Sequence, residues 1–88
     1  KVELLPGHQL HYHSHEHRDE VWTVIAGSGR TVVDGTVRRV RPGDVISIIA
    51  GQKHTIIADS ELQVVEVQLG SEINVADKKK FDFDFDAV

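Results

Sequence analysis

Short runs in which hydrophobic and polar residues alternate recur along the chain, and turn-forming residues separate them. The clearest case is the pair of runs at 31–33 and 36–40, because an Asp34-Gly35 pair between two β-branched runs favours a two-residue hairpin turn. Further strands are expected at 2–5, 20–26, 45–49, 54–58 and 62–69. No run before residue 70 keeps a helical period, so the pattern predicts an all-β sandwich or barrel.

The segment 20–26 differs from the other runs because both of its faces are mostly hydrophobic. Trp22 and Val24 fall on one face of an extended strand, and Val21 and Ile25 fall on the other. A strand with two hydrophobic faces is expected to be covered on both sides.

The chain becomes charged after Gly70, and residues 72–88 are expected to form the tail of a single domain that spans residues 1–88. In this tail Phe81, Phe83 and Phe85 alternate with aspartates, which predicts a final strand with one hydrophobic face. We expect this face to pack on the barrel. The alternatives are a contact with a further domain and a contact between two copies. The contact between two copies, together with pairing of sheet edges, is the basis for expecting a homodimer.

Composition limits the class of protein. The chain has 88 residues, 40% hydrophobic and 27% charged, as expected for one globular domain. A net charge of −4 argues against a nucleic-acid partner. No hydrophobic run approaches the roughly 18 residues of a membrane span, and no signal peptide is visible. The absence of cysteine excludes thiolate ligands and fits a cytoplasmic location. Because the sequence starts at Lys1 and lacks methionine, it is open whether it is a domain of a longer protein.

Five of the six histidines lie within residues 8–17. In an extended strand His11, His13 and His15 would share one face, while Leu10 and Tyr12 would point the other way. Three neighbouring imidazoles favour a metal site, because neutral imidazole is a ligand for zinc, iron, nickel and copper. A solvated surface or an expression tag is the alternative, and the strand-like spacing of the intervening residues argues against a tag.

The spacing of these residues matches a known pattern. Gly7, His13, His15, Glu20 and Gly27 are separated by five, one, four and six residues, as in the first motif of the cupin family. A second segment with Gly43, Ile49, Gly51 and His54 resembles the second cupin motif. Ile49 and Ala58 stand where proline and asparagine are usual, and neither position is a metal ligand. The resemblance implies a double-stranded β-helix, or jelly-roll, barrel.

The same resemblance implies a divalent metal bound by His13, His15, Glu20 and His54. We expect Glu20 to come from the strand beside the histidine strand, and His54 from the strand opposite. Three histidines and one carboxylate suit zinc, manganese, iron, nickel or cobalt, and the sequence does not choose among them. His11 could line the pocket and His17 lies in the following loop, and for both a solvated role is the better interpretation; His8 has no evident partner.

Two further segments, RDEVW at 18–22 and LQVVEVQLGS at 62–71, resemble the cupin domain of type II mannose-6-phosphate isomerases, which often follows a mannose-1-phosphate guanylyltransferase domain. The resemblance extends from residue 2 to near residue 85. It implies aldose–ketose interconversion of a sugar phosphate through an enediol. The chain departs from the family at His13, where glutamine is common, at Lys80, where arginine is usual, and in its FDFDFDAV ending, which replaces Tyr-Gly-Arg.

An isomerase needs a base that reaches the proton exchanged between C1 and C2. Glu66 is the candidate for this base, and Lys53 is the candidate beside His54 for contact with the phosphate group. Lys80 is a further phosphate candidate, and Arg18 and Arg30 are weaker ones. Two other functions stay open: a non-catalytic module that binds a sugar or another metabolite, and an oxygen-using metal cupin.

Overall fold

The structure of the protein is a computed structural model that describes residues 1–70, 74 and 76–88. The described residues form nine strands and one 3₁₀ turn. They are β1 (Val2–Leu4), β2 (Tyr12–Ser14), β3 (Asp19–Ala26), β4 (Gly29–Val33), β5 (Thr36–Val40), β6 (Val45–Ile48), β7 (His54–Ala58), β8 (Leu62–Leu69), β9 (Lys79–Phe81) and η1 (Phe85–Ala87). Within these residues no helix has the length and hydrophobicity needed to cross a membrane.

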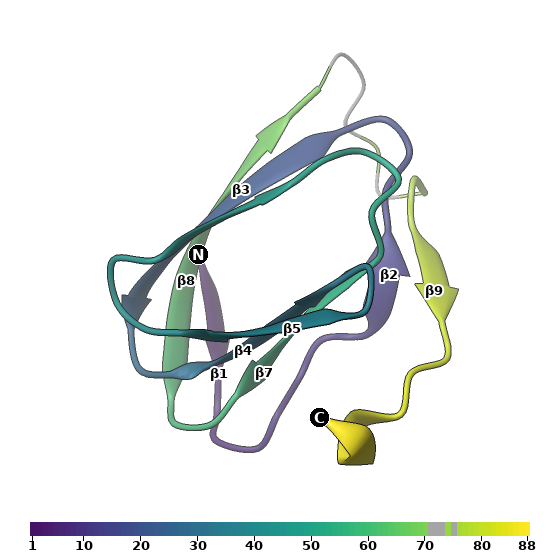
Figure 1. Ribbon diagram of the computed structural model, residues 1–88. Helices are drawn as coiled ribbons and strands as arrows, with labels where there is room; N and C mark the ends of the chain where they lie inside the picture. The colour runs from purple at the N-terminus through teal and green to yellow at the C-terminus, as the bar shows by residue number, and fades with distance from the viewer. Residues whose placement is uncertain (71–73, 75) are drawn as a thin grey trace.

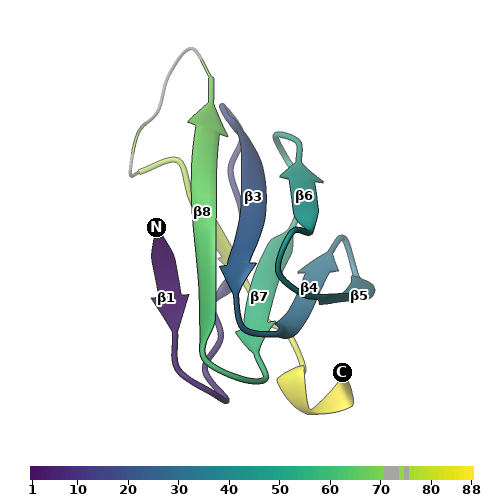
Figure 2. The same ribbon diagram turned by 90° about the vertical axis from the view of Figure 1, so that its left-hand side faces the viewer.

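The strands form two antiparallel sheets that face each other (Figures 1 and 2). One sheet has four strands in the order β1-β8-β3-β6, and the other has five in the order β5-β4-β7-β2-β9. Neighbours in each sheet are mostly distant in sequence, which is typical of a jelly roll rather than a meander. The all-β jelly roll expected from the sequence is therefore confirmed.

A hydrophobic core fills the space between the two sheets. Its buried members are Trp22, Val24, Val40, Ile46, Ile48, Ile56, Ala58, Leu62 and Val64. Trp22 is its largest side chain and is 1% exposed. The Trp22 ring also lies 5.4 Å from the His54 ring, centroid to centroid, so the core continues directly into the cluster of histidines.

The predicted hairpin is present with its expected turn. β4 and β5 pair antiparallel up to Val33 and Thr36, and Asp34 and Gly35 between them have φ values of 47° and 81°. Two successive positive φ values define the tight turn that an Asp-Gly pair favours. This part of the fold follows from local sequence alone.

The prediction that segment 20–26 is covered on both sides was wrong. Trp22 and Val24 of β3 are buried, but Ile25 on the opposite face is 45% exposed. Among the described residues no second layer covers the outer face of the four-stranded sheet. Strands covered on both faces are instead found in the other sheet, where all residues of β2 and β7 are buried.

The tail covers part of the outer face of the five-stranded sheet, over β2, β4 and β7. β9 pairs with β2, and the Phe83 ring lies 4.7 Å from the Tyr12 ring, centroid to centroid. The three phenylalanines pack on a small cluster of Tyr12, Val32 and Ile57. The strand ends at Phe81, earlier than the alternation predicted, and η1 begins after Asp84, whose side chain accepts a hydrogen bond from Asp86 N. Residues 72, 73 and 75 of the predicted tail lie outside the described residues, and the homodimer stays a prediction.

Gly27, which follows β3, lies where the chain passes very close to the main chain of Glu61 at the end of the barrel. Its φ is 83°, and a Cβ atom would lie 1.8 Å from the main-chain oxygen of Glu61. We expect Gly27→Ala to lower the free energy of unfolding by roughly 2–4 kcal/mol, the sum of backbone strain and overpacking. Gly35→Ala is the matched control, because Gly35 has a φ of 81° and a methyl group added there would meet no atom within 4 Å. It should cost only about 1 kcal/mol. Equal losses in urea denaturation, followed by Trp22 fluorescence, would contradict the steric argument.

Candidate metal site

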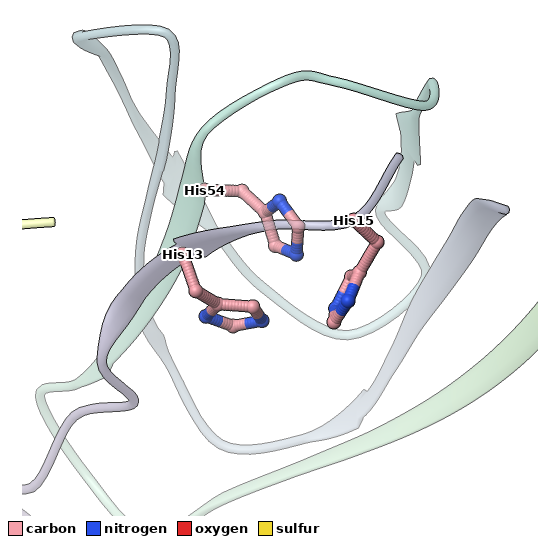
Figure 3. A group of neighbouring side chains, drawn as sticks. All are labelled: His13, His15 and His54. Carbon is pink, nitrogen blue, oxygen red and sulfur yellow. The ribbon is translucent and has the colours of Figure 1, made fainter. Parts of the chain in front are cut away.

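Three histidine rings converge on one space between the sheets (Figure 3). His13 of β2 pairs directly with His54 of β7, so both side chains leave the same face of the sheet, with ring centroids 4.3 Å apart. The His15 ring lies 4.9 Å from the His13 ring and 5.4 Å from the His54 ring. One ring nitrogen of each residue lies within 4.8 Å of the other two, and all three residues are buried. Three nitrogen donors in this arrangement can bind a single metal ion.

Each ring is held by a hydrogen bond between its Nδ1 atom and a main-chain carbonyl oxygen. The distances are 2.5 Å from His13 to His11, 2.6 Å from His15 to Asp77, and 2.9 Å from His54 to Gln52. A carbonyl oxygen only accepts, so we assign the proton to Nδ1 and a lone pair to Nε2 in each neutral ring. Such an outer hydrogen bond is characteristic of histidines that bind a metal through the other nitrogen.

The Nε2 atom of His54 supports a metal at this position. It is buried and has no hydrogen-bond partner among the described residues, and it lies 3.4 Å from Glu20 Oε1. An unpaired buried nitrogen costs about 1–3 kcal/mol. Because the lone pair of His54 Nε2 faces Glu20 Oε1, a proton or a cation between these two atoms would remove this free-energy cost. The residues present therefore fit a divalent metal.

Glu20 comes from the opposite sheet and His54 from the strand beside the histidine strand. The predicted positions of these two residues were therefore wrong, because each lies where the other was expected. β7, which bears His54, is the neighbour of β2, whereas Glu20 belongs to β3 of the four-stranded sheet. The carboxylate of Glu20 is 3% exposed, and its Oε2 lies 3.5 Å from His15 Nε2. Trp22 Nε1 donates a hydrogen bond of 3.2 Å to Oε1 and orients the group. Glu20 thus borders the three-histidine set without belonging to it, and its role as a fourth ligand stays a prediction.

The electrostatic state of these groups suits a metal. Burial lowers the pKa of His13 to about 4, although the hydrogen bond to His11 opposes the shift. Burial likewise lowers the pKa of His15. Burial by itself raises the pKa of Glu20, but the interactions with His54, His15 and Arg18 outweigh it and lower this pKa to about 2. At neutral pH the site therefore offers neutral imidazoles at His13 and His15 and an ionised carboxylate at Glu20.

The histidine cluster opens into a cavity of about 530 Å³. Besides His13 and His15, the polar residues that line it are Gln9, His11, Arg18, Glu20, Glu66, Gln68 and Lys78. Leu10 also lines this cavity, although strand alternation predicted that it would face away from His13. The reason is that β2 begins only at Tyr12, so the alternation does not extend back to Leu10.

Glu66 of β8 reaches this cavity, as a catalytic base would need to do. Glu66 is the pairing partner of Trp22 on β3, so its side chain shares the inner face of the sheet with the Trp22 ring. Burial, and after it the negative charge of Glu20, raise the pKa of Glu66. Gln68, two residues further, lies on the same face, and the period of the strand would have identified it from sequence.

The cations predicted to contact phosphate are distributed differently. Lys53 does not line the cavity; its Nζ atom lies 4.3 Å from the centroid of the Phe81 ring, beside the tail. Arg30 is bound to Asp59 and to the Val88 carbonyl oxygen, also away from the histidines. Lys80 is exposed on β9, whereas Lys78, for which the sequence carried no signal, lines the cavity.

Asp77 is the other residue that sequence reasoning missed. Its carbonyl oxygen accepts the hydrogen bond from His15, and its carboxylate accepts hydrogen bonds of 2.8 Å from the main-chain N–H groups of Glu16 and His17. These bonds lower the pKa of the Asp77 carboxyl group. Because Asp77 is 62 residues from His15 in the sequence, no local pattern indicates the contact.

Loss of the Asp77 carboxylate is expected to weaken metal binding. Without it the two hydrogen bonds that attach Glu16 and His17 to Asp77 are lost, and the carbonyl group that orients His15 is less well placed. Asp77→Ala should lower Zn²⁺ affinity by about tenfold, the low end of the effects seen for outer partners of metal ligands. Competition with a chromophoric chelator measures this, with the exposed Asp82→Ala as control. Equal affinities in the two variants would show that Asp77 does not position His15.

Acid is expected to destabilise the metal-stripped protein from about pH 6.5 downward. The pKa of His13 falls from 6.5 in an unfolded chain to about 4. Between these values the unfolded chain binds a proton that the folded protein does not, so stability decreases as pH falls, by up to roughly 3 kcal/mol. The contribution of Glu20 is lost at lower pH, between 4.5 and about 2.

Urea denaturation at a series of pH values measures this loss. His13→Gln should reduce the slope between pH 6.5 and 4, and the exposed His11→Gln should not. An unchanged slope in His13→Gln would contradict the neutral, buried state of His13.

Comparison with known proteins agrees with this geometry. A family model described as "Cupin domain" matches residues 1–68. The mannose-1-phosphate guanylyltransferase of Escherichia coli (strain K12) is 29% identical over 83 residues, which are 92% of this chain and 17% of that protein. The mannose-1-phosphate guanylyltransferase ManC of Salmonella typhimurium is 30% identical over 84 residues, 93% of this chain and 18% of that protein. The chain thus spans less than a fifth of the length of these relatives.

A solved structure extends the comparison to three dimensions. The crystal structure of a predicted oxalate decarboxylase from Thermotoga maritima matches with a TM-score of 0.75 and 26% identity, over 77% of this chain and 61% of that one. The jelly-roll fold and the resemblance stated from sequence are therefore confirmed. The chain belongs to the cupin-domain family.

Proposed function

We propose that this cupin domain is a metal-dependent isomerase of the mannose-6-phosphate type, which interconverts an aldose phosphate and a ketose phosphate through an enediol. The observation that carries the proposal is the position of Glu66 on the wall of the cavity that the histidines His13 and His15 also line. A carboxyl group at that place supplies the acid–base step that an isomerase needs beside a metal.

Glu66 has the properties of a general base for this reaction. Its raised pKa brings the carboxyl group closer to neutral pH, where a base both accepts and returns a proton efficiently. Glu66 would remove the proton from C2 of the aldose, and the same group would return it to C1. A hydroxyl proton moves from O2 to O1 in the course of the reaction, so the product is an isomer of the substrate.

His13, His15 and His54 would bind the divalent metal, with Glu20 beside His15 and His54. When bound, such an ion supplies Lewis-acid polarisation of the sugar carbonyl group. The hydrogen bonds from the three Nδ1 atoms to main-chain carbonyl groups keep the imidazoles in place without further rearrangement.

Sugar and phosphate recognition are assigned to the remaining wall of the cavity. Its volume of about 530 Å³ lies within the usual range for small-molecule sites. Gln68 and His11 offer donors and acceptors to hydroxyl groups, and Lys78 offers a cation to a phosphate group. Lys78 replaces Lys53 in this role, because Lys53 packs on Phe81 instead.

The curated relatives support a sugar-phosphate ligand, because their names refer to mannose 1-phosphate. Since the chain spans only 17–18% of those proteins, their whole activity is not carried over to it. The homodimer and the cytoplasmic location belong to the same proposal, and the test below does not depend on them.

Replacement of the proposed base tests the function. In the metal-loaded protein Glu66→Gln should lower kcat for conversion of fructose 6-phosphate to mannose 6-phosphate by about 100-fold or more, because the amide cannot accept the proton. Zn²⁺ affinity should stay within about twofold, since Glu66 is not among the metal donors. The exposed Glu61→Gln is the charge-matched control and should keep wild-type activity.

Three results with the unmodified protein would redirect the proposal. No turnover of fructose 6-phosphate by the metal-loaded protein would rule out the isomerase. Retention of sugar-phosphate binding in that case would indicate a non-catalytic binding module. Oxygen uptake with iron bound, in the presence of small organic acids or enols, would indicate an oxygen-using cupin.

A further inference from the structure

The guanidinium group of Arg18 lies against two of the atoms that face the metal position. Its Nη2 atom is 3.0 Å from His15 Nε2, and its Nε atom donates to Glu20 Oε2 at 3.2 Å. The Arg18 side chain is only 11% exposed, so this is a largely buried cation rather than a surface ion pair.

Arg18 relieves the repulsion between two acceptor atoms that face each other, as a metal ion at the site would also do. His15 Nε2 and Glu20 Oε2 are both acceptors and face each other at 3.5 Å. Arg18 places an N–H donor on each of them. In the neighbouring acceptor pair Glu20 Oε1 accepts from Trp22 Nε1, but His54 Nε2 has no donor within the described part of the chain.

A metal ion and Arg18 cannot use His15 Nε2 at the same time. The ring nitrogen has one lone pair, and because Nδ1 is bonded to the Asp77 carbonyl oxygen the other nitrogen cannot substitute for it. A divalent ion at the centre of the three histidines would also lie close to the guanidinium and repel it in a poorly solvated environment. Binding of the ion therefore requires that the bond from Arg18 to His15 be broken.

The cavity provides a place to which the guanidinium can move. Arg18 itself lines the 530 Å³ cavity together with Glu66 and Gln68, which carry acceptor oxygens. A released guanidinium would thus remain inside the site, next to the ligand, instead of turning out into solvent.

We infer that Arg18 is a built-in competitor of the metal, whose guanidinium occupies His15 Nε2 and Glu20 Oε2 and so sets the metal affinity of the site. The inference rests on the metal-binding part of the proposed function and is independent of isomerase activity. The opposite role is that Arg18 holds Glu20 in place for the metal. The two roles predict changes of metal affinity with opposite sign.

The test compares metal affinity in variants that lose the same charge at two places in one cavity. Metal-stripped wild-type protein, Arg18→Met and Lys78→Met are titrated with Zn²⁺ against a chromophoric chelator, and with Co²⁺ followed by its visible absorption. Lys78 lines the cavity but contacts none of the donor atoms named above, so its replacement measures the general effect of removing a positive charge. We expect Arg18→Met to bind Zn²⁺ roughly tenfold or more tighter than wild type, and Lys78→Met to change affinity by less than about threefold.

Arg18→Lys keeps the inference testable if Arg18→Met is unstable. Lysine retains the charge but cannot donate to His15 and Glu20 in the fork geometry of arginine. Its Zn²⁺ affinity is therefore expected to lie between those of wild type and Arg18→Met.

Equal or weaker Zn²⁺ binding in Arg18→Met or Arg18→Lys, with circular dichroism of a folded β protein, would overturn the inference. Absence of Zn²⁺ and Co²⁺ binding in every variant would overturn it together with the metal site. Metal binding that is tighter in Arg18→Met, without isomerisation by any variant, would support it and remove only the isomerase.

Discussion

The direct pairing of His13 with His54 across β2 and β7 is the interaction on which the rest of the site depends. In an antiparallel pair, directly opposite residues put their side chains on the same face at the shortest separation that a sheet allows. A shift of this register by one residue would turn one of the two imidazoles to the outer face. His15 and Glu20 then need only approach a position that His13 and His54 already define.

The register is held from outside the barrel as much as from inside. β9 pairs with the free edge of β2, and the phenylalanines of the tail pack on Tyr12, whose side chain lies on the face opposite His13. The hydroxyl group of Tyr12 also accepts a hydrogen bond from the N–H group of Gly35 in the hairpin turn. The central strands β2 and β7 of this sheet are therefore covered on both sides, with donors for a metal on the inner face and an aromatic layer on the outer face.

Sequence alone predicted what is local and failed where distant segments meet. The Asp34-Gly35 hairpin follows from the φ preferences of two residues, and the three histidines that converge were identified from their resemblance to the two cupin motifs. Spacing did not indicate which strands belong to which sheet, because the motifs are compatible with Glu20 or His54 on either sheet. Lys78 and Asp77 lie in a segment without periodicity, so nothing in the sequence indicated that its backbone would cross to His15.

The polar site also limits how stable the barrel can be without its ion. A chain of 88 residues buries only about 60–65% of its unfolded surface, so hydrophobic packing leaves a small margin. In this protein His13, His15, Glu20 and His54 take up interior positions that hydrophobic side chains would otherwise fill, and the Nε2 atom of His54 has no partner among the described residues. Any ion that binds the folded protein and not the unfolded chain adds its binding free energy to folding. Metal binding and stability are thus linked by the same buried atoms, and Arg18, which pairs with two of them, acts on both.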